Sequence, residues 1–318
     1  MDLDLFDKKI LHTLNQDVRA TYTTIGKKVR LSKEVVNYRI KRLEKEGIIK
    51  AYVTIFGFGY WAYKVLIDFA KITQQREQEI LTYLKNNPHV NWITPCSGGW
   101  DLVFAVMAKN PQQFDTIFRE IINHLGNNLQ NYKIATSIGS NTFGHTYLLG
   151  TTNQKKENKT TTREKNFDEK DKKIAQNIQT NARAKIVDLH KKTHLPPDTI
   201  IYRLKKMEEQ GIIKRYRLIL NPSKLGYNRH EIFLRCTNLT DEVINKFRNY
   251  ARNNPNIEFF SRCTGAWDIE MTIHLKTNDE LRTFILEVKQ QFGNYIQNFE
   301  TVTLFETYNY VYLPEELR

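Results

Sequence analysis

A short run near the N-terminus carries side chains that can bind nucleic acid. Residues 32–43 read SKEVVNYRIKRL, with apolar residues at helical spacing. Asparagine and arginine can hydrogen-bond the edges of bases in a major groove, and lysine and arginine can also hold phosphates. The candidate DNA-binding residues of this run are Ser32, which is also a good N-cap, and Lys33, Asn37, Tyr38, Arg39 and Arg42.

Two of these side chains have an alternative role inside the protein. Tyr38 can pack on its own domain, and Arg39 can pair with glutamates of the chain. We expect Arg39 to contact DNA and leave both roles open for Tyr38.

The same run returns 164 residues later. KRLEKEGIIKAY at 41–52 corresponds to KKMEEQGIIKRY at 205–216 without a gap. Thr199 and Ile201 stand where the first copy has Val35 and Asn37, so we expect the two copies to read different bases or to read unequally well. The candidate DNA-binding residues of the second copy are Thr199, Tyr202, Arg203 and Lys206.

Each run is the third of three short predicted helices. In the first copy these helices span residues 4–16, about 23–29 and 32–46, as the apolar spacing indicates. Gly47 ends the third helix as a left-handed residue would, and Gly211 does the same in the second copy. Three helices with a tight turn between the second and third form a helix-turn-helix, whose third helix enters the major groove.

The charge distribution favours the same interpretation. The chain of 318 residues has a net charge of +13. Residues 1–50 and 167–215 each hold 12 Lys/Arg and 7 Asp/Glu, which gives +5 each, and residues 151–166 add +3. The remaining segments sum to zero. A basic excess confined to two repeated segments and the link between them predicts a polyanionic partner, double-stranded DNA first, over a merely solvated lysine-rich surface.

The neutral segments predict two sandwiches of one β-sheet and two helices. Strand and helix patterns follow the order β-α-β-β-α-β, which is the ferredoxin-like motif. The second copy follows the first at an offset of 167, and the three-residue change in offset predicts a loop insertion near 217–230. We therefore expect an α+β chain of two tandem units: a helix-turn-helix at 1–50, a sandwich at 51–150, a flexible basic linker at 151–166, a helix-turn-helix at 167–215 and a sandwich at 216–318.

These motifs together resemble the Lrp/AsnC (feast/famine) family of transcription regulators. The resemblance lies in the LExxGII ending of the helix-turn-helix and in a G-x-W-D turn at 98–101 and 265–268, and it covers nearly the whole chain twice. LNPSKLGY at 220–227 is similar to the family's turn after the first strand, whereas the first copy has IFGFGYWAY there. The family has one helix-turn-helix and one sandwich per chain, so this protein looks like a fused pseudo-dimer.

The resemblance also implies an effector and further assembly. Family members pair through their sheets, pairs self-associate, and small molecules such as amino acids bind between sandwiches. Glycines of the G-x-W-D turn can offer backbone N–H groups to a carboxylate, and an aspartate can hold an ammonium group. The alternative is that glycine shapes the turn, tryptophan fills the core and aspartate caps the turn. The candidate effector residues are Ser97, Gly98, Gly99, Trp100, Asp101, Thr264, Gly265, Ala266, Trp267 and Asp268.

Other functional classes fit the sequence less well than a transcription regulator does. The siroheme decarboxylases share this architecture, but His274 stands alone on its predicted strand, so we expect no enzyme, no catalytic residue and no cofactor. Cys96, Cys236 and Cys263 form no metal-binding pattern, and we expect no metal site and a reducing cytoplasmic location. A third alternative is a non-specific architectural DNA binder, in which the linker cations would hold phosphates: Lys155, Lys156, Lys159, Arg163 and Lys165.

Overall fold

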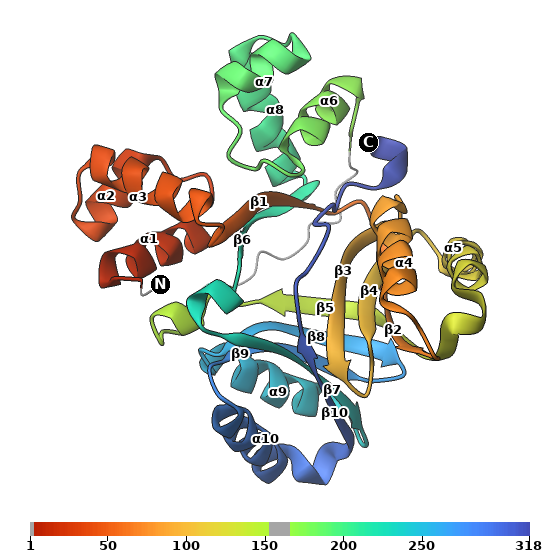
Figure 1. Cartoon of the computed structure of the whole chain (residues 1–318). Coiled ribbons are helices and arrows are strands. Elements are labelled where there is room, and N and C mark those ends of the chain that lie inside the picture. The colour runs from red at the N-terminus through yellow and green to blue at the C-terminus, as the bar shows by residue number, and fades with distance from the viewer. Residues whose placement is uncertain (1–2, 153–165) are drawn as a thin grey trace. The chain divides into compact units, whose positions relative to one another are not determined.

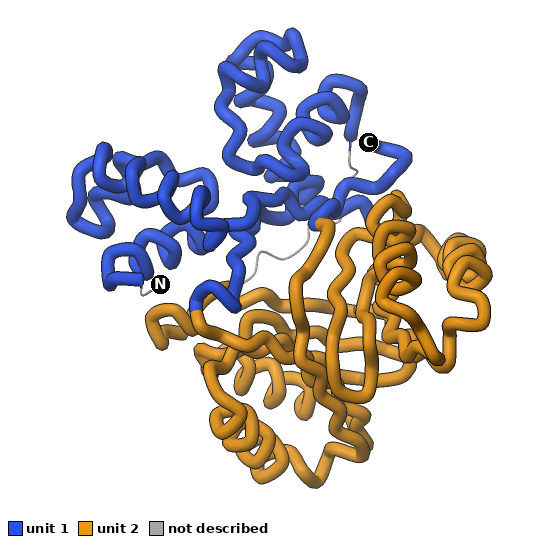
Figure 2. Tube along the Cα trace, in the orientation of Figure 1, with its two compact units in different colours: residues 1–59, 156–225, 310–318 blue, residues 60–155, 226–309 orange. Residues whose placement is uncertain are grey.

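The computed structural model describes residues 3–152 and 166–318 (Figure 1). Most of the predicted linker, with all five of its cations, lies outside the described residues. The chain divides into two compact units (Figure 2). The head unit comprises residues 1–59, 156–225 and 310–318, and the sheet unit comprises residues 60–155 and 226–309.

The first helix-turn-helix, which we call head 1, has its three helices where the pattern predicted them. They are α1 (Leu5–Gln16), α2 (Tyr22–Val29) and α3 (Lys33–Lys45). Each helix begins with a side chain that accepts a backbone N–H: Asp4 from Asp7, Thr21 from Thr24 and Ser32 from Val35. Gly47 follows α3 with φ +67°, a left-handed conformation that glycine adopts without strain.

Head 2 repeats this arrangement. Its helices are α6 (Glu169–Ile178), α7 (Ile186–Thr193) and α8 (Pro197–Glu209). Asp168 and Asp171 form a reciprocal capping box at the start of α6, and proline occupies the first turn of α8. Gly211 follows α8 with φ +64°, as Gly47 does in head 1.

A two-stranded ribbon joins the heads. Strands β1 (Ile49–Phe56) and β6 (Ile213–Leu220) pair antiparallel, with Val53 opposite Arg217. These two positions are 164 apart, so a local twofold axis passes through this pair. We predicted that residues from 51 and from 216 belong to the sandwiches; the structure places β1 and β6 in the head unit instead, because they pair with each other and not with a sandwich strand.

The C-terminal segment also differs from the expected boundary. Residues 310–318, which we assigned to the second sandwich, belong to the head unit and end in the 3-10 helix η5 (Glu315–Leu317). Leu313 is 1% exposed and packs in the core of head 2. An apolar anchor of this kind fixes the tail to the head against the entropy of a free terminus.

The sheet unit contains the two predicted β-α-β-β-α-β copies. The first copy is β2 (Trp61–Phe69), α4 (Gln74–Asn86), β3 (Val90–Gly98), β4 (Leu102–Ala108), α5 (Pro111–Leu125) and β5 (Leu129–Thr142). The second is β7 (Asn228–Cys236), α9 (Asp241–Asn253), β8 (Ile257–Gly265), β9 (Ile269–Leu275), α10 (Asn278–Phe292) and β10 (Ile296–Leu304). Short 3-10 turns occupy Gly126–Asn128 (η1), Thr146–Leu148 (η2), Ser223–Leu225 (η3, in the head unit) and Gly293–Tyr295 (η4).

The two copies share one closed sheet. The strand order is β10-β3-β4-β2-β5-β8-β9-β7, and β10 also pairs with β7. β5 of the first copy pairs with β8 of the second, and β10 of the second pairs with β3 of the first. The tandem α+β fold predicted from the sequence is therefore confirmed, with the sheets joined edge to edge.

Alternating side chains build three cores in this unit. On β2, Val65 and Ile67 face the helices α4 and α5, whereas Leu66 faces the interior of the closed sheet. The second copy has its own helix-covered core, centred on Phe247 and Phe292, whose stacked rings lie 3.9 Å apart. The inner core contains both tryptophans of the G-x-W-D turns, Trp100 and Trp267.

Candidate nucleic-acid interface

The third helix of head 1 has one buried and one exposed side. Val36, Ile40 and Leu43 are fully buried against the head. Tyr38 is 67% exposed, and Lys33 in the first turn is exposed as well. Burial of the apolar residues fixes the rotation of α3, so that its exposed polar side points away from the head. Of the two roles left open for Tyr38, packing on its own domain does not occur.

The third helix of head 2 is oriented in the same way. Its buried residues are Ile200, Leu204 and Met207. Tyr202 is 65% exposed, and its neighbour Ile201 is 52% exposed. Each helix therefore exposes one tyrosine and one aliphatic residue, but at different positions: Ile201 stands where α3 has Asn37, and Val35, 39% exposed, stands where α8 has Thr199.

The structure gives Arg39 partners within its own head, and its contact with DNA stays a prediction. Its Nη1 donates to Asp4 Oδ2 at 2.7 Å and to Asp7 Oδ1 at 2.8 Å, and Arg42 Nη2 donates to Asp7 Oδ2 at 2.5 Å. Asp7 is 1% exposed. The alternative we had considered named glutamates; the partners are aspartates of α1 instead. These bonds fix α1 to α3, so Arg39 positions the recognition helix.

Arg203 has the same role in head 2. Its Nη1 donates to Asp168 Oδ1 at 2.8 Å and to Asp171 Oδ1 at 2.9 Å, and Asp171 is 1% exposed. Partial burial acts against its charge, but the two aspartates raise the pKa of Arg203. Lys206 stands where head 1 has Arg42, so the buried aspartate of head 2 binds one guanidinium group and that of head 1 binds two.

The other predicted residues lie on or beside the exposed sides of these helices. Ser32 is the N-cap of α3, and its Oγ accepts the N–H of Val35 at 3.2 Å. Lys33 is exposed, and Asn37, Thr199 and Lys206 are half-buried, as the three arginines of the predicted set also are. The structure thus brings the predicted residues of each head onto one helix, with the arginines directed back toward the first helix.

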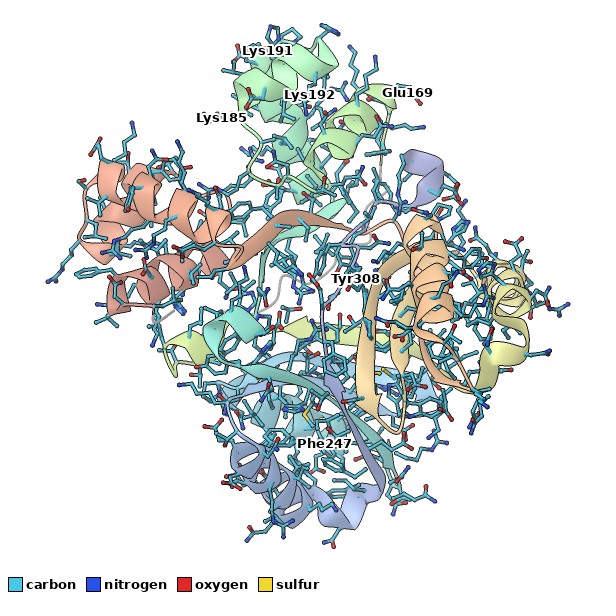
Figure 3. All side chains as sticks on the ribbon, viewed as in Figure 1. Glu169, Lys185, Lys191, Lys192, Phe247 and Tyr308 are labelled. Atoms are coloured by element: carbon cyan, nitrogen blue, oxygen red, sulfur yellow. The ribbon has the colours of Figure 1, made fainter. Side chains whose placement is uncertain are left out.

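The structure shows four exposed lysines that were not among the residues predicted from the sequence to bind DNA. Lys27 and Lys28 are exposed at the end of α2, and Lys191 and Lys192 occupy the equivalent exposed positions of α7 (Figure 3). In a helix-turn-helix the second helix crosses the phosphate backbone while the third enters the groove. These residues could have been found in the sequence, because the lysine pair recurs at the same offset of 164 residues.

The ribbon connects both heads by reciprocal contacts. Arg19 Nη1 donates to the carbonyl of Ala182 at 2.6 Å, and Arg183 donates to the carbonyl of Val18. The guanidinium group of Arg19 lies 5.4 Å from the ring of Tyr216, and that of Arg183 lies 5.4 Å from the ring of Tyr52. Each contact is repeated at positions 164 apart, as a twofold-symmetric interface requires.

Two tyrosine–glutamate bonds connect the ribbon to the recognition helices. Tyr52 Oη donates to Glu44 Oε1 at 2.8 Å on α3, and Tyr216 Oη donates to Glu208 Oε1 at 2.6 Å on α8. Burial and the neighbouring carboxylate raise the pKa of both tyrosines, so both remain donors. The orientation of each recognition helix is thereby coupled to the ribbon.

The candidate effector turns have a clear structural role. Gly98 and Gly265 both have φ +126°. A Cβ at Gly98 would approach Thr301 O to 3.1 Å, and a Cβ at Gly265 would approach Ile134 O to 2.5 Å. Glycine is therefore required where each turn packs on a strand of the other copy.

The tryptophans and aspartates of these turns hold the sheet together. Trp100 and Trp267 are 7% and 2% exposed. Asp101 Oδ2 accepts the N–H of Phe69 and Asp268 Oδ2 accepts that of Cys236, both at 2.8 Å. The structural roles named as alternatives are therefore present at both turns. The exposed members of the predicted set are Ser97, Gly98, Gly99, Asp101, Thr264 and Gly265.

Comparison with known proteins agrees with this arrangement. Residues 3–50 and 167–214 each match the winged helix-turn-helix DNA-binding family. The HTH-type transcriptional regulator FL11 of Pyrococcus furiosus is 32% identical over 121 residues, which are 37% of this chain and 78% of that protein. The chain belongs to the Lrp/AsnC family of transcriptional regulators. It is similar to Bacillus subtilis LrpC at 26% identity, over 45% of this chain and 96% of that one, with a TM-score of 0.38.

A second likeness extends over nearly the whole Lrp/AsnC-type chain. The siroheme decarboxylase NirDL has the same fold over 98% of this chain and 94% of its own, with a TM-score of 0.62 and 13% identity. The tandem arrangement is thus known in a solved structure. In the part of the Lrp/AsnC-type chain that the structure describes, no helix is long and apolar enough to cross a membrane.

Proposed function

We propose that this Lrp/AsnC-type chain is a one-chain reader of double-stranded DNA, in which α3 and α8 occupy two half-sites of one operator. The observation that carries the proposal is the twofold ribbon, which holds two heads with their recognition helices exposed. Reading two half-sites requires two heads in a fixed relation. Elsewhere in the family that relation requires two chains, whereas here one chain supplies it.

The proposed roles within each head follow from residue type and from position on the helix. Lys33, Asn37 and Tyr38 on α3, and Ile201 and Tyr202 on α8, are placed to meet base edges. The lysine pairs of α2 and α7 are placed to hold phosphates, which supplies affinity without sequence preference. Arg39 and Arg203 hold α3 and α8 against the first helix of their heads through hydrogen bonds to aspartates. Because Asn37 favours adenine and an aliphatic side chain favours the methyl group of thymine, the operator is expected to be asymmetric.

A small molecule such as an amino acid is the proposed modulator. The exposed backbone of the G-x-W-D turns supports this, because each turn packs on a strand of the other copy and a ligand there would act on the pairing of the two copies. Self-association of such pseudo-dimers and a cytoplasmic location complete the proposal. Titrating amino acids into the protein–DNA complex tests the modulator: an unchanged affinity across all of them removes it.

Binding to its own upstream region is the test of the main proposal. The purified chain is titrated on that region and on unrelated DNA of equal length, across a salt series. A footprint with two half-sites and a preference over unrelated DNA supports a sequence-reading regulator. Equal and steeply salt-dependent binding to both DNAs overturns it in favour of an architectural binder.

The fold likeness to NirDL defines the second candidate, an enzyme acting on a siroheme-type substrate. We propose instead that the chain acts by binding. His274 supports this, since it is 1% exposed, bonds Glu258 Oε2 at 2.7 Å and stacks on Tyr147 at 4.4 Å. These contacts describe a histidine packed in the core. Titration with an iron porphyrin decides: a saturable change of its visible spectrum at one equivalent would support the enzyme.

A further inference from the structure

Two pairs of equivalent residues meet on the local twofold axis of the sheet unit. In this unit the copies are related by an offset of 167. Lys64 lies 3.3 Å from Glu231, measured from Nζ to Oε1, and these positions are 167 apart. Lys133 also bonds Glu300, again 167 apart. A residue that contacts its own equivalent must lie at the twofold axis, where an identical pair of halves would place two identical side chains.

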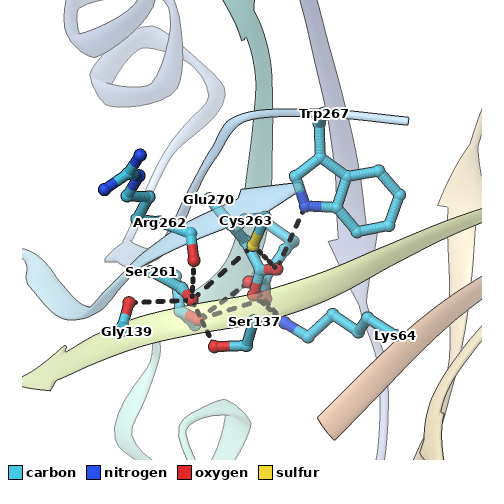
Figure 4. A network of polar contacts seen from close by, with 10 residues as sticks. Lys64, Ser137, Gly139, Ser261, Arg262, Cys263, Trp267 and Glu270 are labelled. Atoms are coloured by element: carbon cyan, nitrogen blue, oxygen red, sulfur yellow. Dashed lines mark hydrogen bonds and ion pairs between the residues drawn. The ribbon is translucent and has the colours of Figure 1, made fainter. Parts of the chain in front are cut away.

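The first of these axis pairs is deeply buried. The Lys64 side chain is 15% exposed, and those of Glu231 and Glu270 are 2% and 1% exposed. Lys64 pairs with both carboxylates, and Thr272 Oγ1 donates to Glu231 at 3.1 Å. Figure 4 shows Lys64 directed into the network around Glu270, whose Oε2 accepts the indole N–H of Trp267 at 3.3 Å. Burial lowers the pKa of Lys64, and the neighbouring Glu231 opposes that shift.

The second axis pair is half-buried and also connected to a turn. Glu300 Oε2 accepts the indole N–H of Trp100 at 3.2 Å, and its Oε1 accepts from Asn298 Nδ2 at 2.9 Å. The Lys133 ammonium lies 5.3 Å from the Trp100 ring. Hydrogen bonds from Lys133 and Trp100 outweigh partial burial and lower the pKa of Glu300, so it is an anion at neutral pH.

The charges are divided by copy. At both axis positions the first copy supplies lysine and the second supplies glutamate, and Glu270, equivalent to Val103, adds a second buried anion to the second copy. A sheet made from two first copies would bring lysine against lysine twice. A sheet made from two second copies would bring four buried carboxylates and two half-buried ones together. Unpaired like charges in a protein interior cost several kcal/mol.

The reciprocal arginine contacts of the head unit show no such division. They are made by Arg19 and Arg183, which are the same residue type and bond backbone carbonyls. Two first heads, or two second heads, could form these contacts equally well. At the ribbon axis Val53 faces Arg217, a pair of one apolar and one charged residue, whereas the axis pairs of opposite charge described here lie in the sheet unit.

We propose that Lys64, Lys133, Glu231, Glu270 and Glu300 form a charge code that makes a first-copy sheet accept only a second-copy sheet. The partner that fits this surface is thus the other half of the same chain. The code closes the chain into one asymmetric reader and excludes exchange of like halves between copies. Assembly of several chains must then use other surfaces.

Two charge-reversed chains test this proposal. The first carries Lys64→Glu and Lys133→Glu, and the second carries Glu231→Lys and Glu300→Lys. Within either chain alone, the two side chains of each axis pair have the same charge. Between the two chains both sheets are complementary, one with the original pairs and one with the reversed pairs. Co-expressed with different tags, the chains are expected to exchange halves and to melt at least about 10 °C above either chain alone.

A crosslink identifies which halves have paired. Ser137 stands opposite Cys263 between β5 and β8, so Ser137→Cys in the first chain provides a disulfide partner across the two copies. Mild oxidation should give a two-chain band on a non-reducing gel for the co-expressed reversed chains, and an intrachain bond for the otherwise unchanged protein. Intrachain bonds in both cases overturn the proposal, whatever other surfaces the chains use to associate.

A single-chain variant covers the case in which the reversed chains do not fold. With Lys64→Glu, Lys133→Glu, Glu231→Lys and Glu300→Lys together, all axis pairs are complementary again within one chain. Its melting temperature should return most of the way to that of the original protein. A fourfold variant as unstable as either reversed chain would show that the native arrangement, and not complementarity, is what the sheet requires.

Discussion

The two heads share the bonds that hold their third helix in place, which we call the frame, and they differ on the surface of that helix. Both fix their third helix through an arginine on two aspartates of the first helix, Arg39 in head 1 and Arg203 in head 2. Both connect that helix to the ribbon by a tyrosine–glutamate bond. On the exposed side, however, Asn37 becomes Ile201 and Lys33 becomes Pro197.

This difference separates two kinds of selection on duplicated residues. The arginine that bonds a buried aspartate, Arg39 or Arg203, is the same in both heads, whereas Arg42, the second guanidinium group on Asp7, is replaced by Lys206 in head 2. Exposed residues of the recognition helix have no such partner and can diverge. The charged pairs at the sheet axis show a third case, in which the two copies carry complementary charges at equivalent positions.

The largest expected effect comes from breaking the shared frame. Asp7→Ala leaves Arg39 and Arg42 without their buried carboxylate, and should destabilise head 1 by about 3 kcal/mol. Asp171→Ala should cost head 2 less, because only Arg203 loses its buried partner. Hydrogen exchange of α3 and α8 measures each head separately.

A matched control is Asp188→Ala, which removes an exposed aspartate of α7. It should leave the exchange of both heads unchanged. Equal loss of protection in both heads after Asp7→Ala would contradict the independence of the two frames.

The next effect tests the cations that the heads share. Lys27→Gln with Lys28→Gln, and Lys191→Gln with Lys192→Gln, should each lower DNA affinity about tenfold and reduce the salt slope by about 2. The loss should be equal for specific and unrelated DNA, because phosphates carry no sequence. Fluorescence anisotropy across a salt series measures both quantities, with Lys71→Gln of the sheet unit as the control. A changed base preference would assign these lysines to the groove instead.

Exchange of the diverged residues sharpens the comparison further. Asn37→Ile should relax the preference for adenine at one position of the first half-site, by about 1–2 kcal/mol, and Ile201→Asn should do the reverse at the second. Both changes in one chain should reverse the preferred orientation of an asymmetric operator. Competition between operators with one substituted half-site gives the answer. An unchanged orientation would place specificity elsewhere on α3 and α8.

Much of this comparison was accessible from the sequence because the two copies differ in length at one place between the ribbon and the sheet. The offset changes from 164 to 167, and the structure places the change between the ribbon and the sheet: the connection at 221–227 is three residues longer than the one at 57–60. The helix ends were also predictable, because they depend on nearby residues. Ser32 caps α3 by accepting the N–H of Val35, and Gly47 follows the helix in a left-handed conformation. The G-x-W-D turns were found by resemblance, and their glycine geometry explains the motif.

Contacts between distant residues were not accessible in this way. The pairing of β1 with β6 depends on which edge each strand meets, and strand pattern alone leaves that open. Arg39 was expected to contact DNA because its place on the helix suits a groove. Its partners in the structure, Asp4 and Asp7, look in the sequence like ordinary acidic residues of a helix N-terminus.

The smallest expected effect concerns pH and tests whether the two frames are equivalent. A hydrogen bond from the backbone N–H of Asp7, with help from Arg39, holds the pKa of Asp4 below its ordinary value of 3.8. Partial burial opposes the same shift at Asp168, where the backbone of Asp171 and the Arg203 side chain still lower the pKa.

A carboxylate with a lowered pKa stabilises the folded head above its unfolded pKa, and this contribution is lost as the pH falls through the folded value. Asp4→Asn and Asp168→Asn keep a capping side chain and remove only the charge. Each should lower stability at pH 7 by about 0.5 kcal/mol, since both aspartates are half-exposed, and the difference from the unchanged protein should vanish near pH 2. Thermal unfolding followed by circular dichroism from pH 2 to 7 measures this difference. A stability difference that persists at pH 2 would mean that the substitution altered the cap and not only the charge. Different losses of stability for Asp4→Asn and Asp168→Asn at pH 7 would show that the two heads differ in the frame as well as on the surface.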